Sequence, residues 1–132
     1  MKVHDMKVSD LMTTALVTIN ASEQLSEAKI DMEMSLVHHL PVVDERGRLV
    51  GIVSDRDIVR RADKKRVSDV MSRDIVTTRP DAPAHLAASM MLEFRIGAVP
   101  VVDDDGALVG VVTITDYLAL ARRALLGLPL ER

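Results

Sequence analysis

Cysteine and tryptophan are absent from the 132 residues, and the chain has a single Phe and a single Tyr. Without cysteine it forms no disulfide, no thiolate zinc site and no cysteine nucleophile, and this composition is compatible with a reducing compartment. The shortage of aromatic side chains nearly excludes the stacking platforms on which single-stranded nucleic acids usually lie. The core must therefore be built from Val, Leu, Ile, Ala and Met.

Long apolar runs and an excess of positive charge are also missing. No run approaches the ~20 apolar residues that span a bilayer, and the N-terminal MKVHDMKVSD has no apolar signal core. The net charge is −3 with neutral His, so no global basic field attracts nucleic acid. We therefore expect a cytoplasmic protein with no membrane partner, and the charge disfavours nucleic acid.

Motifs of catalysis and metal binding are absent as well. The sequence has no P-loop, no nucleophile elbow and no HExxH. His38 and His39 are adjacent, and neighbours in an extended segment point to opposite faces, so we do not expect them to share one ion. We predict no catalytic residues, no metal site and no required cofactor. Either a pH-sensitive contact or a plain lining role fits His38.

An internal repeat dominates what is present. The stretch GIVSDRD, from Gly51 to Asp57, returns 59 positions later as GVVTITD, from Gly110 to Asp116. The same shift places VSDLM (8–12) on VSDVM (67–71), and LPVVDERGRLVGIV (40–53) on VPVVDDDGALVGVV (99–112). No gap is needed, which indicates two copies of one supersecondary unit.

Each copy predicts the order β-α-β-β-α. A polar turn precedes an extended LVTI or IVTT, Asn20 or Asp81 caps a helix, and a hairpin with a D-x-x-G turn follows. Helical spacing predicts two buried faces: Leu25, Ala28, Met32 and Leu36 in the first copy, and Leu86, Met90 and Phe94 beside Ala87 and Met91 in the second. The fold class predicted is α/β (α+β), with two repeats packed with pseudo-twofold symmetry, because ~55 residues alone bury too little surface.

The repeat also predicts the domain boundaries. We expect repeat 1 at 8–60, a basic linker at 61–66, repeat 2 at 67–123 and a C-terminal tail at 124–132. The linker region RRADKKR is interpreted as solvated, as a phosphate attractor at a cleft mouth, or as a weak nucleic-acid patch. The leucine-rich tail packs back or binds a partner. The helical methionines fit either a core or a dimer interface.

The repeated hydroxyl and aspartate have two interpretations. Ser54 stands where a strand gives way to a helix, so free N–H groups and a hydroxyl there favour an anion. The Asp57 carboxylate can accept both hydroxyls of a ribose, and Arg56 can pair with phosphate. The same spacing is equally an ordinary helix cap. The residues alone leave these two interpretations balanced.

At these residues the chain resembles a tandem pair of CBS domains (the cystathionine-β-synthase domain, whose pair is called a Bateman module). The resemblance rests on V-S-D-L/V-M, P-V-V-D, D-x-x-G and G-h-h-S/T-x-x-D in both copies, over roughly residues 8–123. It implies a stand-alone regulatory module. Such pairs bind AMP, ADP, ATP or S-adenosylmethionine between repeats and commonly form homodimers that signal to an effector protein.

The resemblance also implies two ligand sites. The first comprises Ser54, Arg56, Asp57, Thr77, Thr78, Gly97 and Ala98, and the second Thr113, Thr115, Asp116, Thr18, Ile19, Val37 and His38. Arg56 suits the first site to extra phosphate charge, where the second has Thr115. The alternative hypothesis is a structural dimerisation module without a nucleotide ligand, and an enzyme acting on nucleotides is the least favoured.

Overall fold

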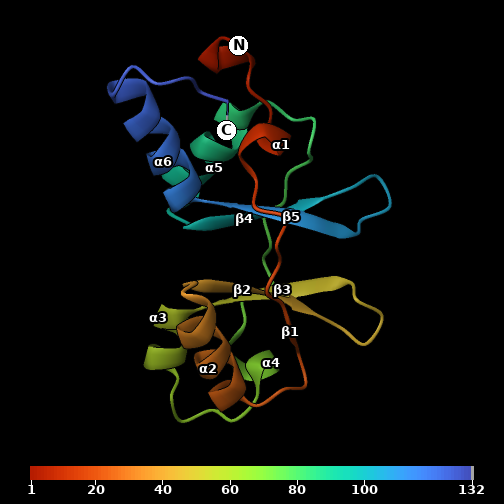
Figure 1. Ribbon diagram of the computed structural model, residues 1–132. Coiled ribbons are helices and arrows are strands. Elements are labelled where there is room, and N and C mark those ends of the chain that lie inside the picture. Colours follow the sequence, from red (N-terminus) through yellow and green to blue (C-terminus); the bar gives the residue numbers. More distant parts are fainter. Residues whose placement is uncertain (132) are drawn as a thin grey trace. The chain divides into compact units, whose positions relative to one another are not determined.

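The computed structural model describes residues 1–131, which form two compact units (Figure 1). Unit 1 combines Met1–Leu16 with Val76–Arg132, and unit 2 is the continuous segment Val17–Ile75. Arg132, the last residue of the predicted tail, lies outside the described residues. The repeated α+β organisation that the sequence predicts is confirmed, because the two units contain matching elements.

Unit 2 is a small sheet with helices packed on it. Its elements are β1 (Ile19–Asn20), α2 (Leu25–Ser35), β2 (His39–Val43), β3 (Leu49–Ser54), α3 (Asp55–Arg60) and α4 (Val67–Val70). The strand order is β1-β2-β3, with β1 parallel to β2 and β3 antiparallel to it. The register pairs His39 with Ser54, which brings the histidines beside the start of α3.

Unit 1 repeats this plan with small differences. Its elements are a short 3-10 helix (Val3–Asp5), α1 (Val8–Leu11), α5 (Ala84–Phe94), β4 (Ala98–Val102), β5 (Leu108–Thr113) and α6 (Ile114–Leu125). The register of the β4–β5 hairpin pairs Ala98 with Thr113. The counterpart of β1 is reduced to one parallel bridge between Thr78 and Val101.

The short helix that opens each sequence repeat lies in the unit formed mainly by the other repeat. Val67 of α4 is buried in the core of unit 2, and Val8 of α1 is buried in the core of unit 1. Backbone hydrogen bonds fix each exchange: Ser72 pairs with Ile52, and Thr13 with Val111, through N–H to oxygen distances of 2.8–3.1 Å. The compact units therefore divide the chain differently from the repeats.

This exchange explains why both copies contain glycine in G-h-h-S/T-x-x-D. A Cβ built on Gly51 would lie 2.7 Å from Met71 Sδ and 3.0 Å from the Ser72 backbone oxygen. On Gly110 it would lie 2.8 Å from Met12 Sδ. The exchanged segment therefore approaches the backbone of β3 closely at Gly51.

The predicted helix faces are partly right. Leu25, Ala28 and Met32 of α2 are buried as expected. Leu36 is 87% exposed, because the helix ends there with a left-handed backbone (φ 56°). That part of the prediction is wrong.

In α5 the buried face is Ala84, Ala87 and Met91, at the positions that match the buried face of α2 after the 59-residue shift. Leu86 and Phe94 are exposed. Ala87 and Met91 are therefore buried as predicted and Met90 packs against the same core, whereas the prediction is wrong for Leu86 and Phe94. Apolar spacing alone assigned these large side chains to the buried face. The 59-residue shift from the buried face of α2 identifies the face that is buried in α5.

The predicted helix caps are wrong. Asn20 Oδ1 accepts hydrogen bonds from Ser22 N–H at 3.0 Å and Ser22 Oγ at 2.8 Å, so it closes a turn before α2. Gln24 and Pro83 are the actual N-cap residues, and Asp81 lies before the start of α5. The VSD segments, expected to be turns, are single-turn helices.

The hairpin turns follow the sequence prediction. Gly47 and Gly106 end the two D-x-x-G turns with φ values of 77° and 80°. Asp103 Oδ1 accepts the N–H groups of Asp105 and Ala107, each at 2.9 Å. The turn aspartate therefore satisfies backbone donors, as its position predicts.

The tail and the linker are both tied to their units. Leu130 packs against the core of unit 1, and Arg123 Nε donates to the Pro129 oxygen at 2.6 Å. The linker side chains are exposed, but the Lys65 oxygen accepts the Leu25 N–H at 2.8 Å. Across residues 1–131, no helix has the length and apolar character needed to cross a bilayer.

Candidate functional site

The hydroxyl and aspartate of the first copy form a reciprocal cap on α3. Ser54 N–H donates to Asp57 Oδ2 at 2.9 Å, and Asp57 N–H donates to Ser54 Oγ at 3.2 Å. Both residues are half-buried where β3 ends. The capping interpretation is therefore correct at this junction. The second carboxylate oxygen, Asp57 Oδ1, accepts no hydrogen bond from the described residues, and exposed Arg56 lies beside it in sequence.

The second copy has the same junction with an additional partner. Thr113 N–H donates to Asp116 Oδ2 at 2.8 Å, and Thr113 Oγ1 lies 3.3 Å from the same oxygen. Thr13 Oγ1 donates to Asp116 Oδ1 at 3.3 Å. Both oxygens of Asp116 are thus engaged within unit 1. The two aspartates differ in how much acceptor capacity they retain.

A histidine–aspartate contact adjoins the first junction. His38 Nδ1 lies 2.9 Å from Asp55 Oδ2, and Asp55 N–H donates to the His38 oxygen at 3.0 Å. Burial raises the pKa of Asp55, but hydrogen bonds from His38 and from the Arg56 backbone outweigh it, so that pKa is lowered. The equivalent of His38 in unit 1 is Gly97, whose oxygen accepts the Ile114 N–H at 3.2 Å.

His39 lies on the other side of the strand and is half-buried. Desolvation lowers the pKa of His39, and the nearby His38 and Arg56 lower it further, against the opposing effect of Asp55 and Asp57. His39 is therefore held toward its neutral form. In the described part of the chain, no group of three His, Cys, Asp or Glu side chains is arranged to hold a metal ion.

Each predicted site draws residues from both units, so its halves are described separately. Unit 2 contains Ser54, Arg56 and Asp57 of the first site, and Thr18, Ile19, Val37 and His38 of the second. Unit 1 contains Thr77, Thr78, Gly97 and Ala98 of the first site, and Thr113, Thr115 and Asp116 of the second.

Within each unit, backbone pairing in the β-hairpin places the strand-to-helix junction next to other residues of the predicted sites. Ala98 pairs with Thr113 in unit 1, and the His38 oxygen receives the N–H that follows Ser54 in unit 2. Ile19 and Thr78 are buried. Thr18, Thr77 and Thr115 are exposed.

Two residues with side-chain contacts at these junctions, Thr13 and Asp55, were not predicted from the sequence. Thr13 bonds Asp116, and a signal for it existed: VSDLM and VSDVM are each followed by a hydroxyl residue, Thr13 or Ser72. Asp55 bonds His38, but the matching pair in the second copy is Gly97 and Ile114. The repeat therefore offered no signal for the Asp55 contact.

Comparison with known proteins places this architecture in one family. The model of the CBS domain matches the chain twice, over residues 8–64 and 67–123. Inosine-5'-monophosphate dehydrogenase of Methanocaldococcus jannaschii is 34% identical over 113 residues, which are 85% of this chain and 23% of that enzyme. The chain spans about a quarter of the length of the first curated relatives it matches. A CBS domain-containing protein of Dictyostelium discoideum is 33% identical over 92% of this chain and 95% of its own length.

Solved structures agree with the sequence matches. The CBS domain pair of protein MJ0100, in complex with 5'-methylthioadenosine and S-adenosyl-L-methionine, superimposes with a TM-score of 0.86. It is 33% identical, with 90% of this chain and 98% of that chain covered. CBSX2 of Arabidopsis thaliana, in complex with AMP, gives a TM-score of 0.80 at 30% identity, covering 90% and 98%. The chain therefore belongs to the CBS domain family and contains two CBS domains in tandem.

Proposed function

We propose that the chain is a regulatory module that binds an adenosine-containing ligand and signals through a conformational change to a partner protein. The observation that carries the proposal is the hydroxyl–aspartate pair at both strand-to-helix junctions, Ser54 with Asp57 and Thr113 with Asp116. Both similar CBS pairs described above were solved with adenosine compounds bound. The same compounds, AMP and S-adenosylmethionine, together with ADP and ATP, are the candidate ligands here.

The first site, around Asp57, is the stronger candidate. Asp57 Oδ1 keeps an acceptor for a ribose hydroxyl while Asp57 Oδ2 caps the helix. The exposed guanidinium of Arg56 supplies the positive charge that a phosphate requires. The remaining members of this proposed site are Thr77, Thr78, Gly97 and Ala98.

The second site, around Asp116, offers less. Its carboxylate already accepts from Thr113 and Thr13, and Thr115 replaces the cation. Its other proposed members are Thr18, Ile19, Val37 and His38. We therefore expect a phosphate-bearing ligand to prefer the first site.

Thermal unfolding with AMP, ADP, ATP and S-adenosylmethionine tests the proposal. A ligand at ~100 times its dissociation constant stabilises the fold by about 2.7 kcal/mol, which raises the unfolding temperature by several degrees for a domain of this size. Asp57→Asn should abolish the shift, since the amide oxygen can still accept the capping bond while an NH2 group replaces the free acceptor Oδ1. Asp69→Asn is the matched control, because it makes the same substitution at a similar cap on α4 of the same unit.

The result also distinguishes the alternative function. If none of the four ligands shifts the unfolding temperature, the regulatory proposal fails and a structural dimerisation module is favoured. If a ligand still raises the unfolding temperature of both Asp57→Asn and Asp116→Asn, the protein binds that ligand, but not at the proposed sites.

Homodimerisation is part of the proposal and rests on exposed apolar side chains. Leu92 of α5 is 81% exposed and Met34 of α2 is 80% exposed. The helices α5 and α6 also expose Phe94 and Leu118. The exposed apolar side chains on α5 and α6 of unit 1 support an interaction surface there. Light scattering should give twice the monomer mass, and Leu118→Glu should lower it; a monomeric parent protein would contradict this part.

A further inference from the structure

Unit 2 contains a cavity that the proposed adenosine sites do not use. Its volume is about 670 Å³, within the range of small-molecule pockets. The lining residues come from the start of α2, from α3 and from the segment before α4: Gln24, Leu25, Ser26, Lys29, Ile58, Val59, Ala62, Lys64, Lys65 and Arg66. None of them is among the residues proposed for adenosine.

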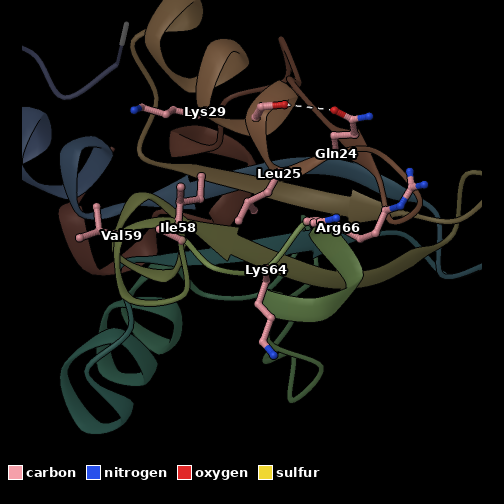
Figure 2. Close-up of a pocket in the computed structure, with 10 residues that line it drawn as sticks. Gln24, Leu25, Lys29, Ile58, Val59, Lys64 and Arg66 are labelled. Carbon is pink, nitrogen blue, oxygen red and sulfur yellow. Dashed lines mark hydrogen bonds between the residues drawn. The ribbon is translucent and has the colours of Figure 1, made fainter.

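The middle of this cavity is apolar. Figure 2 shows Leu25 and Ile58 near the centre, with Val59 beside them. Leu25 belongs to the buried core and Ile58 packs on it, so the floor is fixed by the fold. A surface of this kind favours the apolar part of a ligand.

The edge of the cavity is basic. Lys29, Lys64 and Arg66 extend outward on different sides (Figure 2), and Lys65 also lines it. The lining contains no Asp or Glu. Lys64 has a long 3.9 Å contact with exposed Asp63, whereas Lys29 and Lys65 form no ion pair within residues 1–131.

The equivalent place in unit 1 shows what this space accepts. Both units share the backbone frame there: Leu25 N–H bonds the Lys65 oxygen, and Ala84 N–H bonds the Met6 oxygen, each at 2.8 Å. In unit 1 the space is occupied by the chain itself. Met6 is buried, and Tyr117 packs on the core with its hydroxyl donating to the Ala84 oxygen at 2.6 Å.

Unit 2 lacks both of these groups. By the 59-residue shift, Lys65 stands where unit 1 has Met6, and Ile58 where it has Tyr117. The helix also stops at Arg60 in unit 2, whereas α6 continues to Leu125. In unit 1 the side chains of Met6 and Tyr117 occupy this space, and in unit 2 the same space is an open cavity.

Charge changes at the same positions. Lys29, Lys64 and Lys65 correspond to Ala88, Asp5 and Met6, none of which is positively charged, while Arg66 corresponds to Lys7 and stays basic. In unit 2 an open apolar floor therefore coincides with three positive charges that the matching positions of unit 1 lack. We propose that this cavity binds a small amphiphilic anion, a short alkyl or aryl group that carries a phosphate or carboxylate.

The apolar group and the anionic group of the ligand contact two different sets of residues. The apolar group occupies the space that Tyr117 fills in unit 1, against Leu25 and Ile58. The anion lies near the ammonium groups of Lys29 and Lys65, which are free of competing carboxylates in the described chain. Neither part alone is expected to bind well, because exposed charge pairs contribute little by themselves.

Octyl phosphate is the probe, with octanol and inorganic phosphate as its two halves. Titrations are followed by the methyl NMR signals of Leu25, Ile58 and Val59 in the full chain, below the micelle concentration. Octyl phosphate should produce saturable shifts, octanol should bind about tenfold more weakly, and inorganic phosphate should leave these methyl signals unmoved. A tenfold change corresponds to about 1.4 kcal/mol.

Two kinds of variant test the residues. Lys29→Gln with Lys65→Gln should weaken octyl phosphate about tenfold, while the matched double variant Lys2→Gln with Lys7→Gln, in unit 1, should bind as the parent does. Ile58→Tyr places the filler of unit 1 in the cavity and should abolish binding. Ala62→Phe does the same from an exposed position if Ile58→Tyr fails to fold.

Several results would overturn the proposal. They are the absence of saturable shifts with octyl phosphate, equal affinity for octanol, and equal losses in the two lysine double variants. The proposal would also fail if the protein bound anionic phospholipid vesicles but free octyl phosphate caused no methyl shifts. That result would favour binding to a membrane surface. The AMP-induced thermal shift, measured in Ala62→Phe, keeps this outcome separate from that of the adenosine proposal.

Discussion

Thr13 and Asp116 lie 103 positions apart in sequence and share a hydrogen bond of 3.3 Å from Oγ1 to Oδ1. The bond joins the segment after α1 to the first turn of α6. It reinforces the backbone pairing of Thr13 with Val111. The first repeat is thereby connected to the core of unit 1 through a side chain as well as through the main chain.

Replacement of Thr13 by Val should therefore destabilise the protein. The shape of the side chain is preserved, and the lost hydrogen bond to a charged group costs about 1.5–3 kcal/mol when well formed; at 3.3 Å we expect the lower end. Urea unfolding would show a lower midpoint with an unchanged slope.

The equivalent Ser72→Ala in unit 2 is the control. The Ser72 hydroxyl makes no hydrogen bond with the described residues, so its loss should leave the midpoint almost unchanged. Equal effects of the two substitutions would show that the Thr13–Asp116 bond does not contribute to stability.

Gly51→Ala should lower the free energy of unfolding by about 1–3 kcal/mol, as overpacking of a core does. The new Cβ meets Met71 Sδ at 2.7 Å and the Ser72 oxygen at 3.0 Å. The methionine can move, but the backbone oxygen is fixed by its pairing with Ile52. Gly110→Ala should cost less, because the corresponding backbone contact, with the Thr13 oxygen, is 3.2 Å.

Gly47→Asn provides the matched surface control. Its Cβ would contact nothing within 4 Å, and asparagine tolerates a φ of 77°. Thermal unfolding of the three variants should rank them with Gly51→Ala lowest and Gly47→Asn nearest the parent. A Gly51→Ala protein as stable as the parent would mean that the exchanged segment is not packed against β3.

The hairpins and the strand-to-helix caps could be predicted because each has a local sequence signal, and the repeat because the two copies match without a gap. Asp44 and Gly47 mark a turn, and Ser54 with Asp57 marks a helix start, whatever the rest of the chain does. The short exchanged helices have no such signal. Val8 and Val67 are buried by residues far away in sequence, and an ungapped repeat looks the same whether its first helix packs on its own copy or on the other.

The helix faces were mispredicted because the burial of a helix also depends on distant residues. Apolar spacing placed Leu36, Leu86 and Phe94 inside, but a protein surface contains many large apolar residues, especially where a partner binds. Alanine at 84 and 87 carries a weak signal although both are buried. The proposed ligand sites are harder still to predict, because each would combine residues from both repeats.

Leu36→Gly should stabilise the protein by about 0.5–1 kcal/mol. Leu36 has a φ of 56° and is 87% exposed, so its side chain gains little from burial while its backbone is strained. Glycine removes a left-handed penalty of about 1–2 kcal/mol, partly offset by its greater freedom in the unfolded chain. Chemical unfolding should give a higher midpoint for this variant.

The neighbouring Ser35→Gly should have the opposite sign. Ser35 is the last residue of α2, where glycine is a poorer helix former, by up to about 1 kcal/mol in a helix interior. Arg95→Gly, at the same place after α5 with φ 53°, should repeat the gain. Loss of stability in both Leu36→Gly and Arg95→Gly would refute the strain argument.

His39 should make the stability of the protein depend on pH in the mildly acid range. Burial lowers the pKa of His39 below the value of about 6.5 in an unfolded chain. The unfolded state therefore binds the proton more readily than the folded state, so stability is complete above pH 6.5 and falls as the pH drops through that value. The loss is complete below the folded pKa, where both states are protonated.

Urea midpoints at pH 7.5 and 5.5 measure this effect, and His39→Gln should show a smaller loss than the parent. His4→Gln, at an exposed position, should lose as much as the parent does. Asp55 does not contribute to the difference between pH 7.5 and 5.5. Its pKa is lowered from 3.8, so its contribution to stability is lost only at more acid pH. An equal loss in His39→Gln and the parent would assign the pH dependence to another group.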